Sequence, residues 1–229
     1  KQKMFSEEFN VKSTTDGRYK WLFGAFGFWQ GIDNTVIMDY LSAAYSSRKL
    51  YDTPTYGIAF YHQSTFEDLL VDGLSATIGI RYDYERASTD YLSFKDTEEE
   101  SKELDAFYSK LKFSQVTPKF ALQYMFPSSG IIYATVTKGY KTGGFNTSFE
   151  REEDRSFRPE SSWNYEVGGK HPFLDNRLRA EIALFWIDWK NQQISQSLTV
   201  GSMLNNAGRS ESKGVEVSLQ GNPVNGLMV

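Results

Sequence analysis

The chain has 229 residues, a net charge of −4 and no cysteine, which excludes disulfides and thiolate metal sites. Its acidic balance, with a pI of about 5.4, leaves no basic footprint for nucleic acid. Aromatic residues make up 16% although the mean hydropathy is −0.49, and no run of about 18 apolar residues is present to form a transmembrane helix. Such a composition is typical of a transmembrane β-barrel or of an aromatic-rich soluble β domain.

Ten segments have the alternating pattern of strands. They are residues 4–13, 19–30, 53–66, 74–85, 110–126, 131–138, 160–171, 178–190, 206–221 and 226–229, the last one truncated. In residues 74–85 every second side chain is apolar, so this strand has one apolar and one polar face. The face predicted to meet lipid carries Leu74, Ile78, Ile80 and Tyr82. The face predicted to line the lumen carries Thr77, Arg81 and Asp83. Pro118 lacks an N–H and predicts a bulge or a strand end.

The connections between these strands alternate in length. The short ones are residues 14–17, 67–73, 127–130, 172–177 and 222–225. The long, polar ones are residues 31–52, 86–109, 142–159 and 191–205. Outer-membrane barrels combine tight periplasmic turns with long extracellular loops, whereas nothing forces the long loops of a soluble sandwich to one end. The alternation therefore favours a membrane barrel whose long segments lie outside the cell.

Residues 138–146 read KGYKTGGFN and follow the strand-like run IIYATVT. Gly139, Gly143 and Gly144 are predicted to permit positive φ and tight bends. Strand and motif together resemble a signature of the barrel of TonB-dependent outer-membrane receptors. Later residues fit further family motifs in the same order, namely Glu160, Asn164, Tyr165, Glu166, Gly168, Lys170, Asn206, Gly208, Gly214 and Glu216.

This resemblance implies an all-β fold: an antiparallel transmembrane β-barrel segment of about ten strands within a barrel of about 22. Residues 1–229 would be a partial barrel domain, without the plug domain and without the C-terminal end of the barrel. The implied activity is not enzymatic and uses no cofactor. It is active uptake, in the bacterial outer membrane, of a scarce bulky solute such as a ferric siderophore, cobalamin or a glycan. The implied partners are the TonB complex, reached through the plug, the outer-membrane lipids and that small-molecule or glycan ligand, with no nucleic acid.

Two other classes stay open on the sequence: a passive porin or adhesin barrel, and a soluble β-rich ligand-binding module. No catalytic constellation is present. The residues predicted to contact a ligand surround the long segment after Gly139, because loops on a rigid scaffold commonly carry binding. They are Tyr140, Phe145, Arg151, Arg155 and Arg158. The alternative for each is an ordinary exposed loop position.

The remaining candidates have simpler interpretations. His62 and His171 lie on different strands without a metal-ligand spacing, which favours a surface, lumen or packing role. The acidic run 96–100 is weakly suited to Ca²⁺ and is better explained as a solvated charge run. The formal glycosylation acceptor at Asn146 is attributed to chance. The tryptophans are predicted to be interface-girdle or lipid-facing residues rather than to stack on a ligand. They are Trp21, Trp29, Trp163, Trp186 and Trp189.

Overall fold

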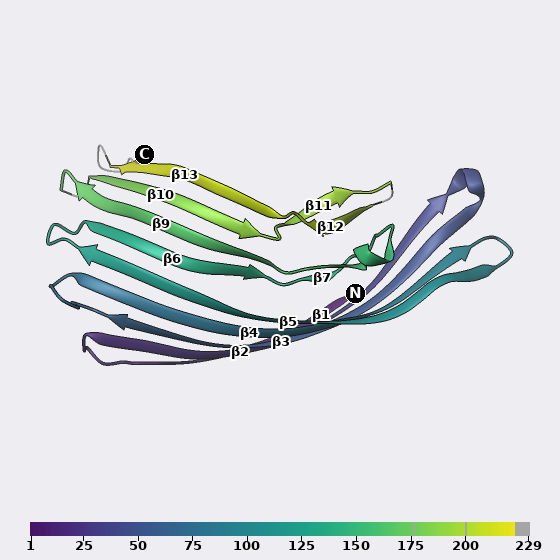
Figure 1. Cartoon of the computed structure of the whole chain (residues 1–229), viewed down its shortest axis with the longest axis horizontal. Helices are drawn as coiled ribbons and strands as arrows, with labels where there is room; N and C mark the ends of the chain where they lie inside the picture. The colour runs from purple at the N-terminus through teal and green to yellow at the C-terminus, as the bar shows by residue number, and fades with distance from the viewer. Residues whose placement is uncertain (176, 200, 223–229) are drawn as a thin grey trace.

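The computed structural model describes residues 1–175, 177–199 and 201–222. In this part of the chain nine strands form one antiparallel sheet, in the order β1-β2-β3-β4-β5-β6-β9-β10-β13 (Figure 1). Their bounds are β1 (Gln2–Lys12), β2 (Tyr19–Tyr40), β3 (Tyr45–Phe66), β4 (Leu74–Asp96), β5 (Ser101–Met125), β6 (Ile131–Lys141), β9 (Glu160–Phe173), β10 (Leu178–Lys190) and β13 (Arg209–Gly221). Each strand pairs with the next of these along the chain, so the sheet is a continuous meander.

Two further strand pairs lie within the long connections. β7 (Gly144–Phe145) pairs with β8 (Ser156–Phe157), and β11 (Gln193–Ser197) pairs with β12 (Ser202–Asn206). Short 3₁₀ turns occupy η1 (Leu41–Ala43) and η2 (Glu152–Arg155). Among the described residues, no helix is long and apolar enough to cross a membrane.

Nine of the ten predicted strands are confirmed, and the tenth, residues 226–229, lies outside the described residues. The sheet is curved, with the short turns at one end and the long connections at the other (Figure 1). The prediction for Pro118 was wrong, because β5 continues through it and pairs it with Ile80 without a register shift. On its other side β5 pairs with β6 only from Lys119 to Met125, so this ladder stops next to Pro118 although β6 continues to Lys141.

Residues 31–52 and 86–109 were predicted to be polar connections, and this was wrong. The β2–β3 ladder extends to the pair Tyr40 and Tyr45, and the β4–β5 ladder extends to Asp96 and Ser101. The alternation of apolar and polar residues is hard to recognise in these segments, because the apolar face of the sheet changes from one side to the other partway along the strands. Near the short turns the apolar residues of β4 lie on one face, whereas further along it is the opposite face that is buried, at Ala87 among others.

We call the face that carries Ile78 the outer face and the face that carries Arg81 the inner face. Direct register partners run from Ile78 along one row of the outer face, through Phe120, Val136, Tyr165 and Trp186. The inner face over the same strands is polar: an Arg81 nitrogen lies 2.7 Å from Asp83, and Tyr133 Oη donates to Glu166 at 2.6 Å. The predicted division of β4 into an apolar and a polar face is confirmed.

Aromatic rings mark both limits of the apolar band on the outer face. Tyr19 stacks on Phe66 at 5.0 Å near a short turn, and Trp29 pairs in register with Tyr56 further along the same two strands. Tyr19 and Trp29 are separated by about 33 Å along β2. If the strand is tilted by ~45°, this distance spans ~23 Å across the membrane, close to the ~25 Å apolar band of outer-membrane barrels. By alternation four tryptophans lie on the outer face as predicted. Trp189 does not, because it is out of phase with Trp186 along β10.

A candidate ligand-contact site on the inner face

The connection between β6 and β9 folds back over the inner face and is held there by Asn146. The Asn146 side chain is only 6% exposed. Its Nδ2 donates to the carbonyl oxygens of Asp154 at 2.8 Å and Leu204 at 2.9 Å, and its Oδ1 accepts the Leu204 N–H at 2.8 Å. The Asn146 side chain therefore holds the two ends of residues 142–159 together and connects this segment to β12. The formal glycosylation acceptor thus has a buried, structural side chain.

An aromatic cluster lies beneath this connection. The ring of Tyr91 on β4 lies 5.0 Å from Tyr51, 4.7 Å from Phe107 and 5.6 Å from Phe149, which comes from the connection itself. The Tyr51 hydroxyl donates to the carbonyl oxygen of Thr147. Burial, and secondly the neighbouring Tyr91, raises the pKa of Tyr51, and burial also raises that of Tyr91. Both phenols therefore remain neutral donors at physiological pH.

Arg155 places a cation on this cluster. Its guanidinium carbon lies 4.2 Å from the centre of the Phe107 ring and 5.6 Å from that of Phe149. One Nη donates to Asp105 at 3.0 Å, and the side chain is 23% exposed. Its Nε is buried without a hydrogen-bond partner. A buried, unpaired donor on a charged group is costly, so an anionic or carbonyl acceptor would be stabilised at this point.

A second group of free polar atoms lies at the loop-side end of β6. The Tyr140 hydroxyl, Thr142 Oγ1 and Gln193 Oε1 are all buried and form no hydrogen bond of good geometry, and Thr142 interacts with both Tyr140 and Glu85. Gln193 joins the two long connections, because its Nε2 donates to the carbonyl oxygens of Thr142 at 2.7 Å and Arg158 at 3.1 Å. Natural proteins leave few buried polar atoms unpaired, and groups of them commonly mark functional positions.

The five predicted ligand residues are not equivalent. Arg155 joins the aromatic cluster and Tyr140 has a buried hydroxyl, whereas Phe145 lies in β7 opposite Ser156. Arg151 is 65% exposed and forms ion pairs with Glu153 and Asp154 within its own loop. The side chain of Arg158 is exposed, and its main chain bonds to Asn206.

Sequence reasoning missed the residues that hold these loops in place. In the sequence Asn146 is only the last residue of the KGYKTGGFN motif, and Gln193 lies within the polar segment 191–205. Tyr51, Tyr91 and Phe107 lay in segments predicted to be connections. The alternation of aromatic and polar residues in these segments was the one signal that could have predicted strands there.

The glycines of the KGYKTGGFN motif serve close packing rather than positive φ, as the only positive-φ glycines among the described residues are Gly73 and Gly201. A Cβ on Gly143 would overlap the carbonyl oxygen of Phe157 and lie 2.9 Å from the Phe113 ring. At Gly139 it would lie 2.7 Å from the Ser162 hydroxyl. The expected role of these glycines in positive-φ turns was therefore wrong.

Both histidines pack on the outer face. The ring of His62 stacks on Phe23 at 4.1 Å, and its nitrogens contact the Leu22 carbonyl oxygen at 3.0 Å and Ser64 Oγ at 2.8 Å. The ring of His171 fills the space over Gly130. These contacts confirm the packing interpretation.

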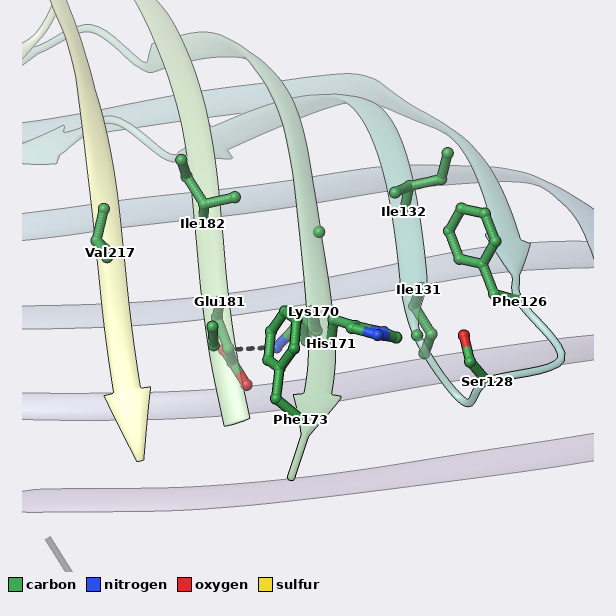
Figure 2. Close-up of a pocket in the computed structure, with 13 residues that line it drawn as sticks. Phe126, Ser128, Ile131, Ile132, Lys170, His171, Phe173, Glu181, Ile182 and Val217 are labelled. Atoms are coloured by element: carbon green, nitrogen blue, oxygen red, sulfur yellow. Dashed lines mark hydrogen bonds and ion pairs between the residues drawn. The ribbon is translucent and has the colours of Figure 1, made fainter. Parts of the chain in front are cut away.

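A groove of about 540 Å³ lies beside His171 at the short-turn end of the sheet (Figure 2). Apolar side chains from neighbouring strands, including Ile132, Ile182 and Val217, line it together with Phe173. Its position on the outer face separates it from the inner-face cluster.

The acidic run 96–100 is a hairpin turn. Asp96 is paired with Arg48 at 2.7 Å, and the Thr97 N–H donates to the carbonyl oxygen of Glu100 at 2.8 Å. Among the described residues, no group of His, Cys, Asp and Glu side chains is arranged to hold a metal ion.

Comparison with known proteins gives one consistent result. Residues 2–228 match the family model described as TonB dependent receptor-like, beta-barrel. The pesticin receptor of Yersinia pestis is 27% identical over 164 residues, which are 70% of this chain and 23% of that protein.

Solved structures agree. The ferric yersiniabactin uptake receptor FyuA from Yersinia pestis aligns with a TM-score of 0.79 at 23% identity, over 98% of this chain and 33% of that one. The ferric citrate transporter FecA aligns with a TM-score of 0.52 at 12% identity, over 96% of this chain and 39% of that one. The chain thus spans about a quarter to two fifths of these relatives. It belongs to the TonB-dependent receptor family and forms part of the family's β-barrel in the bacterial outer membrane.

Proposed function

We propose that this chain is part of the wall of a receptor that takes up a ferric siderophore across the outer membrane, with energy supplied by TonB through a plug domain. The family consists of transport receptors, and two of its similar members are named for siderophore and pesticin reception. One observation carries the proposal. The two long connections are locked together, the half-buried guanidinium of Arg155 is held over the inner face by Asp105 and Glu152, and further polar atoms lie buried at the loop-side end of β6.

This arrangement suits an anionic, oxygen-rich chelate. Arg155 offers Nε beside two aromatic rings, and Tyr140, Thr142 and Gln193 offer further hydrogen-bonding atoms. We therefore propose Arg155 and Tyr140 as ligand contacts on the wall. We propose Phe145, Arg151 and Arg158 as residues that shape the loop around them.

The test is uptake of ⁵⁵Fe-labelled ferric yersiniabactin by cells that carry the full-length receptor, with and without a functional TonB. We expect uptake that requires TonB and that falls at least ~10-fold in Arg155→Gln, because hydrogen bonds to charged groups contribute about 1.5–3 kcal/mol. Arg209→Gln is the matched control, since Arg209 is exposed on the outer face and paired with Asp188.

Uptake that persists without TonB would indicate a passive barrel instead. If ferric yersiniabactin is not taken up, the same cells should be tested with ferric citrate, cobalamin and glycans before the iron assignment is abandoned.

A further inference from the structure

The groove beside His171 is a gap in one row of large side chains on the outer face. Gly169 on β9 lies in register between Ile132 on β6 and Ile182 on β10, and the row continues to Val217 on β13. Ile132 therefore stands on one side of the gap, and Ile182 and Val217 stand on the other (Figure 2). The missing side chain of Gly169 forms the floor between them.

The floor continues toward the short turns because the ring of His171 leans away from it. This ring lies over Gly130, where a Cβ would overlap its Nδ1, and the ring of Phe173 meets it edge-on at 4.6 Å. Ala180, the register partner of His171 on β10, also lines the groove. Its small side chain extends the hollow to the rim that His171 and Phe173 form.

The groove is about as long as one leaflet of the membrane is thick. Ile182 lies four residues from Leu178, the first residue of β10, which is about 14 Å of strand. At a tilt of ~45° this is ~10 Å across the membrane, close to half of the ~25 Å apolar band. A hydrocarbon chain that reaches from the interface to the middle of the bilayer matches this length.

The free polar groups of the lining lie at the short-turn end. Lys170 and Glu181 are paired with each other at 3.1 Å (Figure 2). Ser128 is exposed at the tip of the turn after β5, and within the described part of the chain the ring nitrogens of His171 form no hydrogen bond. An amphiphile in the groove would therefore meet hydrogen-bonding groups at the interface and apolar side chains further in.

A second apolar groove on the outer face differs in this respect. It has a volume of about 510 Å³ and is lined by Phe60 and His62 among others. The two ring nitrogens of His62 already contact the Leu22 carbonyl oxygen and Ser64 Oγ. The histidine of that groove is therefore not available to a headgroup, whereas His171 is.

From this gradient of polarity we infer that the groove beside His171 binds a glycerophospholipid of the leaflet on the short-turn side. One acyl chain lies along Gly169 and Ala180, and the phosphodiester accepts hydrogen bonds from the His171 ring and the Ser128 hydroxyl. A lipid is the fitting occupant because the groove opens on the apolar outer face of a chain that belongs to an outer-membrane barrel family. The inference depends on that location and not on which solute is transported.

The experiment uses the full-length receptor, stripped of lipid in detergent and titrated with dioleoylphosphatidylethanolamine under native mass spectrometry. Dioleoylglycerol, which has the same chains but no phosphate, is titrated in parallel. We expect the parent to bind the first phospholipid at least ~10-fold more tightly than the diacylglycerol, since hydrogen bonds to a charged group change affinity by about this factor or more. His171→Phe should remove this preference and leave diacylglycerol binding unchanged.

Gly169→Leu tests the apolar part of the groove. A Cβ at Gly169 would lie 3.3 Å from the Ile131 carbonyl oxygen and 3.5 Å from Ile132 Cγ2, so a small shift admits the side chain. It displaces about two methylene groups of the acyl chain, each worth roughly a fourfold change in affinity, and both lipids should bind about fifteenfold more weakly. The matched control is Gly27→Leu on the outer face of β2, where a Cβ would meet only the Gly57 carbonyl oxygen, at 3.9 Å.

Equal phospholipid binding by the parent and Gly169→Leu would overturn the inference, as would an equal loss in Gly27→Leu. A parent that binds the two lipids equally would also overturn it, by showing that no headgroup sits at His171. A receptor dimer that Gly169→Leu dissociates would show a second copy in the groove instead. If Gly169→Leu does not assemble, Ala180→Leu fills the groove from β10 and decides, with the same expected loss. Solute uptake is measured separately, so failure here leaves the proposed transport intact.

Discussion

Asn146 and Leu204 are joined by two hydrogen bonds, from the Leu204 N–H to Asn146 Oδ1 at 2.8 Å and from Asn146 Nδ2 to the Leu204 carbonyl oxygen at 2.9 Å. The side-chain amide thus forms the same pair of hydrogen bonds with β12 that the backbone of a neighbouring strand would form. The two long connections consequently behave as one unit over the inner face, although the residues that join them are far apart in the chain.

We expect Asn146→Ala to release these connections without disturbing the barrel, because the sheet ladders do not depend on that amide. Losing buried hydrogen bonds costs about 1–3 kcal/mol where polar partners are left unpaired. Hydrogen–deuterium exchange on the full-length receptor should show faster exchange in residues 142–159 and 193–206 only. Asn205→Ala, at an exposed neighbouring position, is the control. Unchanged exchange in Asn146→Ala would show that other contacts hold the loops.

The assignment of faces on β4 predicts unequal effects at adjacent positions. Ile78 is 51% exposed on the outer face, whereas Thr77 faces inward and contacts Thr65 Oγ1 at 3.0 Å. Ile78→Lys should cost about 2–4 kcal/mol near the bilayer midplane. Thr77→Lys should cost about 1 kcal/mol or less, the scale of one hydrogen bond. Equal unfolding free energies of the two variants in lipid vesicles would reverse this assignment.

The sidedness of the sheet predicts a labelling pattern. We expect the hairpin turn at Glu99 to lie outside the cell and the short turn at Ser128 to lie in the periplasm, because long connections of such barrels are extracellular. Both positions are exposed. On intact cells Glu99→Cys should react with an impermeant thiol reagent, and Ser128→Cys should react only after the outer membrane is opened. The reverse pattern would invert the topology.

A row of three acidic residues on the outer face predicts a pH dependence, because Asp52 lies in register between Asp33 and Asp90. Partial desolvation, and secondly the carboxylates of Asp33 and Asp90 beside it, raise the pKa of the exposed Asp52 above its ordinary value of 3.8. The folded state therefore binds this proton more tightly than the unfolded state. Desolvation and repulsion of the charged carboxylate together destabilise the protein at neutral pH, and this cost disappears as pH falls through the raised pKa.

We expect Asp52→Asn to stabilise the full-length receptor at neutral pH by about 0.2–1 kcal/mol, and to have no effect once Asp52 is protonated. Urea unfolding in lipid vesicles across this pH range measures the difference. Glu99→Gln, at the exposed hairpin turn, removes the same charge and should lack this pH dependence. A benefit of Asp52→Asn that is independent of pH would show that charge repulsion is not its cause.

The sequence by itself determined the strands that cross the membrane and the side chains that face lipid. It could do so because alternation is a local property: in residues 74–85 the pleat turns every second residue to the same side, and lipid requires that side to be apolar. The KGYKTGGFN motif and its neighbours likewise identified the family, since a motif is read residue by residue.

Only the tertiary structure decided which residues form the inner-face cluster and where the hairpins end. Beyond the apolar band the buried side of the sheet is the inner one, and it is buried by a connection distant in sequence. Tyr91 is covered because Phe149 lies on it, and Phe149 is in place because Asn146 binds Leu204. No local pattern records such contacts. The sequence could therefore predict Arg155 as one of five candidate ligand contacts in and beside a loop. Only the fold shows that its guanidinium lies over the Phe107 ring.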